Sequence, residues 1–148
     1  MRARANLAVL ALAAVAAWAQ AAGVLPVLGE PLGQSQNSQA SVRRLPAAAS
    51  VHEYRTADGG TLRAYVAAGG TVFGLAWEAP TAPNLSQLLG QRFEAFQKAA
   101  AAQSQRKGPL YVHSGDLVVE VSGHMRDFRG RAYLAAMIPS GLTPAVVR

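Results

Sequence analysis

The run predicted to be most deeply buried reads Thr71-Val72-Phe73-Gly74-Leu75-Ala76-Trp77-Glu78. Successive side chains of a strand point to opposite faces of its sheet, which places Phe73, Leu75 and Trp77 together on one face. The residues between them are also apolar or small, so neither face of this strand suits water. A strand that is apolar on both faces is expected to lie in the middle of the fold.

Two further strands are predicted before this run, over Val51–Thr56 and Thr61–Val66. They are separated by Asp58-Gly59-Gly60, and the second is separated from the buried run by Gly69-Gly70. Glycine adopts the positive φ angles that tight hairpin turns require. The three strands are therefore predicted to form an antiparallel meander.

A helix is predicted after the meander. Pro80 and Pro83 end the strand pattern, and Asn84 then has the character of an N-cap, with Gln87 three residues later to complete a capping box. Apolar residues recur beyond it at helical spacing, and Gly108-Pro109 closes the segment. The expected buried face consists of Leu85, Leu88, Leu89, Phe93, Phe96 and Ala100.

The last third returns to strand periodicity. Leu110–His113 is a short strand, and Leu117–Met125 and Arg131–Met137 are expected to pair as an antiparallel hairpin. A five-residue loop over Arg126–Gly130 would set Met125 opposite Arg131, and a shorter loop would set His124 there.

The predicted fold class is therefore α+β. A three-stranded antiparallel meander is followed by one amphipathic helix packed on the sheet, and then by two or three further antiparallel strands. This single domain is expected over residues 50–148.

The N-terminus has the features of a secretory signal peptide over residues 1–21. Arg2 and Arg4 precede the apolar run Leu7–Ala19, and Ala19-Gln20-Ala21 supplies small residues at the cleavage site. The alternative is an uncleaved anchor, because the chain stays largely apolar as far as Leu28. The predicted location is periplasmic or secreted, with membrane contact only through this segment if it is not cleaved.

Residues 22–49 are predicted to be a flexible tether, because proline, glycine and a neutral polar run punctuate them. The chain contains no cysteine, which excludes disulfides, thiolate metal sites and a cysteine nucleophile. Its formal net charge of +6 falls by two when Arg2 and Arg4 are removed. This mild excess permits an acidic partner, and no nucleic-acid partner is expected.

Several short motifs occur in a fixed order between Val51 and the C-terminus, and together they resemble an uncharacterised Gram-negative bacterial family, domain of unknown function 2844. The resemblance implies a small exported domain and carries no assigned activity. The motifs are Val51-His52-Glu53, Arg63-Ala64-Tyr65-Val66, Gly70-Thr71-Val72-Phe73, Ala76-Trp77, Pro83-Asn84-Leu85, Gln87-Leu88-Leu89-Gly90, Ser122-Gly123-His124-Met125-Arg126, Phe128 and Gly130-Arg131-Ala132-Tyr133.

The candidate binding site is a basic cluster around the predicted hairpin loop, formed by His124, Arg126, Arg129 and Arg131. Forked guanidinium groups bind phosphate or carboxylate groups well, so this cluster is predicted to accept an anion or an acidic partner. The alternative is a solvated turn without a ligand.

No catalytic set, metal site or cofactor is predicted. Glu120, Ser122 and His124 share one face of a strand, but residues two apart on a strand lie about 7 Å apart, too far for a nucleophile and its base. His52 and His113 are not spaced with His124 as metal ligands.

The expected function is therefore that of an exported, non-enzymatic domain that binds a protein or an envelope component. The alternative is a small periplasmic hydrolase or transferase that uses His124 and its neighbours. A cleft that gathered His124, Arg131 and a carboxylate would favour the enzyme.

Overall fold

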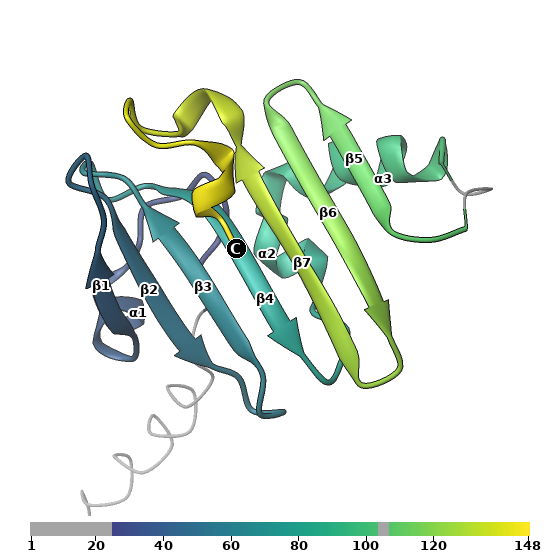
Figure 1. The fold of residues 1–148 in the computed structure, drawn as a ribbon, viewed down its shortest axis with the longest axis horizontal. Coiled ribbons are helices and arrows are strands. Elements are labelled where there is room, and N and C mark those ends of the chain that lie inside the picture. Colours follow the sequence, from purple (N-terminus) through teal and green to yellow (C-terminus); the bar gives the residue numbers. More distant parts are fainter. Residues whose placement is uncertain (1–24, 104–106) are drawn as a thin grey trace, which may run out of the picture.

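The computed structural model describes residues 25–103 and 107–148. Its centre is one antiparallel sheet of seven strands, which confirms the α+β class but is larger than the sheet expected (Figure 1). The strands lie in the order β1-β2-β3-β4-β7-β6-β5. They are β1 Ser41–Arg44, β2 Ser50–Arg55, β3 Thr61–Val66, β4 Val72–Ala79, β5 Leu110–Ser114, β6 Leu117–His124 and β7 Asp127–Leu134.

The chain builds this sheet from two halves that meet at β4 and β7. Strands β1 to β4 form the first half by successive hairpins. The chain then crosses one face through helices α2 (Leu85–Leu89) and α3 (Phe93–Ala101) and forms the far edge as β5. Strands β6 and β7 bring it back to pair with β4. The buried run predicted from the sequence thus lies at the middle of the sheet.

The predicted helix is present but broken. The Asn84 side chain accepts a hydrogen bond from the Gln87 amide (3.3 Å), as an N-cap should. Gly90 then adopts φ +53°, a conformation that favours glycine, and separates α2 from a short 3-10 turn and α3. Leu88, Leu89 and Phe96 are buried in the core against β4, whereas Phe93 is only half-buried. The periodicity predicted the right face but not the break.

The prediction that Phe73 shares a face of the sheet with Leu75 and Trp77 is wrong, because β4 contains a bulge. Between Tyr65 and Val66 the register shifts, so that one step along β3 corresponds to two along β4. Leu75 and Trp77 face the helices, whereas Phe73 lies in the core on the opposite face of the sheet. A bulge places an extra residue in one strand, and strict alternation cannot reveal it.

The segment predicted to be a tether packs on the domain wherever the structure describes it. Leu28 is 2% exposed, and its amide donates to the Leu88 carbonyl (2.9 Å). The Gly29 amide donates to the Val72 carbonyl (2.8 Å), and β1 adds an edge strand beside β2. The contacts of Leu28 and Gly29 are made with residues far away in the sequence, which a composition rich in proline and glycine does not indicate. The predicted signal peptide, residues 1–21, lies outside the described residues.

The register of the β6–β7 hairpin also differs from both predicted alternatives. His124 lies opposite Asp127, and Glu120 lies opposite Arg131. The turn consists of Met125 and Arg126 alone, with Arg126 at φ +71°. Glycine or asparagine usually occupies such a position and marks a tight turn in a sequence. Here the position is occupied by Arg126, so the sequence did not indicate the two-residue turn.

The second face of the sheet is covered by the C-terminal segment, shown in yellow in Figure 1. After β7 it forms two short 3-10 turns, Ala135–Met137 and Pro144–Val146, and brings Val147 fully into the core beside Tyr65, Phe73 and Tyr133. The C-terminal segment does not cover the whole of this face, and parts of β3, β4 and β7 there line a cavity. Within the described ranges, no helix is long and apolar enough to cross a membrane.

Candidate functional site

The open part of this second face carries a row of charged residues that crosses the whole sheet. Pairing places Glu53, Arg63, Ala76, Arg131, Glu120 and Tyr111 next to one another on successive strands from β2 to β5. An arginine therefore lies on each side of the small central residue, Ala76, and a glutamate lies beyond each arginine. Cross-strand pairs of opposite charge stabilise a sheet, and this row contains two of them.

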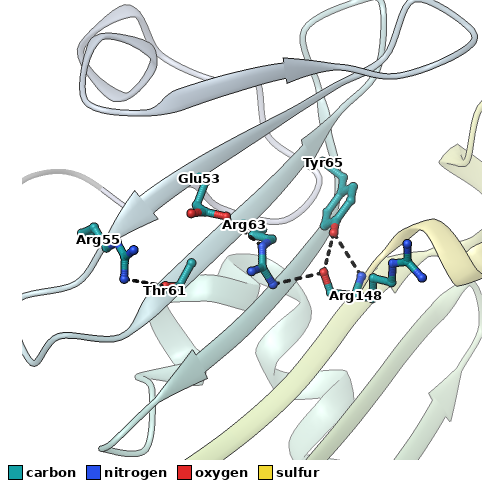
Figure 2. A network of polar contacts seen from close by, with 6 residues as sticks. All are labelled: Glu53, Arg55, Thr61, Arg63, Tyr65 and Arg148. Atoms are coloured by element: carbon teal, nitrogen blue, oxygen red, sulfur yellow. Dashed lines mark hydrogen bonds and ion pairs between the residues drawn. The ribbon is translucent and has the colours of Figure 1, made fainter.

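Arg63 belongs to the first half of the row and contacts the C-terminal segment (Figure 2). Its Nε donates to Glu53 Oε2 (3.0 Å), and its Nη1 donates to the Arg148 carbonyl (3.4 Å). The Tyr65 hydroxyl donates to the same carbonyl (2.7 Å) and accepts from the Arg148 amide (3.1 Å). The backbone of Arg148 is thus fixed, while the polar contacts found for it among the described residues leave its guanidinium unused.

Arg131 belongs to the second half and holds the C-terminal segment from the other side. Its Nε and Nη2 donate to the two carboxylate oxygens of Glu120 (2.5 and 3.0 Å). Its Nη1 donates to the carbonyls of Pro144 and Val147, each at 3.2 Å. Hydrogen bonding to Glu120 raises the pKa of Arg131, so it remains a cation. All three nitrogens are committed, which makes Arg131 a structural clamp.

Arg129 lies beside this row, two residues before Arg131 on β7. Its Nε donates to Asp127 Oδ1 (2.8 Å), and its Nη2 pairs with Glu78 Oε1 (3.1 Å). The side chain remains 59% exposed, and its contacts leave Nη1 without a partner in the described part of the chain. Exposed pairs of this kind are weak and exchange readily with other anions.

Together these residues surround a shallow cavity of about 500 Å³, which we call the sheet-face hollow. Ala76 and Gly130 contribute to its lining at the middle of the sheet, and Tyr111, at 49% exposure, stands at its β5 end. Its charged lining consists of Arg63, Glu78, Glu120, Arg129, Arg131 and Arg148.

The hollow is richer in available donors than in available acceptors. Both oxygens of Glu120 are occupied by Arg131, and Glu78 accepts from Arg129. The guanidinium of Arg148 has five N–H donors, and Arg63 and Arg129 each leave one terminal nitrogen unused in the contacts described above. A set of unused guanidinium donors suits a carboxylate or phosphate group.

The structure divides the four residues predicted to form the anion site. Arg129 and Arg131 line the sheet-face hollow. His124 and Arg126 lie at the exposed tip of the β6–β7 hairpin, beside Met125, which is 90% exposed. Because Arg131 is opposite Glu120, four residues before His124, the tip lies about 13 Å farther along the sheet.

Sequence reasoning missed Arg63, Arg148 and Tyr111. The predicted hairpin around Asp58-Gly59-Gly60 makes the strands of Glu53 and Arg63 neighbours, but the predicted strand ends pair Thr56 with Thr61 and would set Ala64 opposite Glu53. The observed register is one residue different and sets Arg63 there. Arg148 joins the hollow through the path of the C-terminal segment, for which the sequence carries no periodic signal. Tyr111 lies on the predicted strand Leu110–His113 and reaches the hollow because β5 pairs with β6.

The histidines and the polar face of β6 offer no assembled catalytic group. Among the residues that the structure describes, no three histidine or acidic side chains converge as they would around a metal ion. His52 is buried, with Nε2 2.9 Å from Ser50 Oγ, and burial lowers its pKa. The Glu120 carboxylate is bound by Arg131, and Arg131 does not lie opposite His124.

The fold and the hollow define a class: an α+β domain with one antiparallel sheet and an arginine-lined cavity on the face away from its helices. The chain belongs to the family described as "Protein of unknown function (DUF2844)", whose family model matches residues 25–147. This confirms the resemblance seen in the sequence motifs. Comparison with curated proteins finds no match, and comparison with solved structures finds none either.

Proposed function

We propose that this protein is an exported, non-enzymatic binding domain that takes an acidic partner, either a protein or an envelope component, in the sheet-face hollow. The observation that carries the proposal is that the guanidinium of Arg148 has no partner among the described residues, while Arg148 lines the hollow together with Arg63 and Arg129. Forked guanidinium donors bind planar anionic groups with geometric specificity.

The arrangement favours binding over catalysis because its charged groups are held in fixed pairs. A general acid or base must exchange a proton with the substrate, and guanidinium groups stay protonated at any physiological pH. The carboxylate of Glu120 binds Arg131 through both of its oxygens. What remains free is positive charge, which attracts and orients an anion.

Export is part of this proposal and rests on the signal-peptide pattern of residues 1–21. The family match begins at residue 25 and the first strand of the sheet at Ser41, so cleavage after Ala21 would leave both in the mature chain. N-terminal sequencing of protein recovered from the periplasm should begin at Ala22. Recovery of the intact chain in the membrane fraction would instead support the uncleaved anchor.

Binding is tested by capture from envelope extract, with the protein purified after export and immobilised. The hollow variant R129Q/R148Q is compared with the hairpin-tip variant R126Q and with R44Q, which removes an exposed arginine from β1. We expect capture to weaken as salt rises, because exposed charges are screened, and to be lost only in the hollow variant. Equal capture by the wild type and the hollow variant, with the folds intact, would contradict the proposal.

A further inference from the structure

The sheet-face hollow has features that narrow the chemistry of its ligand. We propose that it binds an acidic oligosaccharide, with a carboxylate or phosphate group on Arg148 and Arg63 and a sugar ring against Tyr111. This inference rests on the proposed function and adds the class of ligand to it.

The first argument concerns the length of the hollow. Arg63 lies on β3 and Tyr111 on β5, four strand positions away in the sheet order. Neighbouring strands are about 4.8 Å apart, so the backbones that carry these two residues are about 19 Å apart. A single small anion cannot contact both ends. A chain of several sugar rings can.

The second argument concerns the mixture of polar groups between the two ends. Glu78, Ser122 and Arg129 also line the hollow and present both donors and acceptors, while the Glu120 carboxylate is bound by Arg131. Sugar hydroxyl groups donate and accept at the same time, so they can satisfy such a lining without displacing its ion pairs. A ligand that carried only carboxylates would meet repulsion from the two glutamates.

The third argument concerns the shape of the surface. Ala76, the central residue of the charged row, has a small side chain on this face, so the middle of the hollow is low and open. Tyr111 is half-exposed although it lies on an edge strand where a polar residue would suffice. An aromatic ring beside a flat polar surface can cover the apolar face of a sugar ring while its hydroxyl stays in water.

The probes are trigalacturonate, neutral maltotriose and tetraglutamate, titrated by calorimetry into the protein purified after expression of the full chain. We expect trigalacturonate to bind, and maltotriose to bind at least about tenfold more weakly because charge-assisted hydrogen bonds are lost. R148Q should weaken trigalacturonate binding about tenfold. The matched variant R44Q should leave it unchanged.

The role of the ring is tested with Y111L, which keeps apolar bulk on β5 without an aromatic face. We expect it to weaken trigalacturonate binding several-fold and to leave tetraglutamate binding unchanged. If tetraglutamate binds as tightly as trigalacturonate and depends on Arg148, the saccharide inference is wrong and the proposed anion-binding function stands. If neither acidic probe binds, or R44Q weakens binding as much as R148Q does, both are wrong.

Discussion

Arg131 was predicted to bind a ligand, but its guanidinium stabilises the fold instead. Every nitrogen of its guanidinium is engaged, with Glu120 on one side and the carbonyls of Pro144 and Val147 on the other. Hydrogen bonds that involve a charged group are worth more than neutral ones, and partial burial limits their screening. Arg131 therefore joins the sheet to the segment that covers its second core.

We expect R131Q to lower the free energy of unfolding by about 1–3 kcal/mol, because it removes a bidentate pair and two backbone contacts. R129Q is the matched control on the same strand, and the loss of its exposed ion pairs should destabilise the protein less than R131Q does. Urea unfolding measures both. If R131Q lowered the free energy of unfolding less than R129Q does, Arg131 would not be holding the C-terminal segment on the sheet.

His52 is a second residue with a specific consequence, because it is buried and its Nδ1 has no partner in the described structure. Burial lowers its folded-state pKa below the ordinary 6.5, so the unfolded chain takes up a proton first as pH falls. Stability should thus be full above about pH 6.5 and decrease as the pH falls through the lowered pKa. His52→Gln should flatten this dependence between about pH 7.5 and about pH 5 in urea titrations. An unchanged slope would show that other groups cause it.

At the scale of elements, β7 can pack against β4 only because Gly130 lies opposite Trp77. A Cβ at Gly130 would overlap the Trp77 ring and come within 2.6 Å of the Glu120 carbonyl. We expect G130A to destabilise the protein by about 1–3 kcal/mol through overpacking. Gly69, where a Cβ meets nothing within 4 Å, provides the control, and G69A should be close to neutral. Equal effects of the two variants in thermal unfolding would contradict this packing.

The broken helix gives a second prediction at this scale. Phe96 on α3 is buried in the core, and Phe93 is half-buried with its ring centroid 6.0 Å from that of Phe96. Phe96→Ala should cost about 3–5 kcal/mol, and Phe93→Ala clearly less. Chemical denaturation of both variants tests the order. The reverse order would mean that the apolar face of α3 is rotated relative to the sheet.

The elements also show how far a sequence predicts such a fold. The strand predicted from Leu117 is present and places Leu117 and Val119 in one core and Val118 in the other, as strand alternation requires. Asn84 caps its helix as expected. Local patterns determine those features. The bulge beside Phe73 and the left-handed Gly90 depend on contacts between distant segments, and no local period records them.

The candidate site was predictable to the same extent. The arginines of β7 were identified as a basic cluster, but their surroundings depend on the register of the hairpin. A two-residue turn at Met125 and Arg126 shifts that register and turns Arg131 toward Glu120. The remaining members come from β3, β5 and the C-terminal segment, and only the tertiary fold brings them together.

At the scale of the whole molecule, the two faces of the sheet have different roles. Helices α2 and α3 cover one face and complete the main core. The C-terminal segment covers only part of the other face, and the uncovered part is the sheet-face hollow. The segment that closes the second core also carries Arg148 to the edge of that hollow, so it contributes both to the core and to the proposed binding site.

We propose that an acidic ligand binds in the hollow and not at the hairpin tip. NMR spectra of the arginine Nε–Hε groups, recorded while trigalacturonate and then tetraglutamate are added, test it most directly. We predict saturable shifts for Arg148 and Arg63 with at least one acidic probe, and none for Arg126. Shifts confined to Arg126, or an absence of saturable shifts with both probes, would contradict the account.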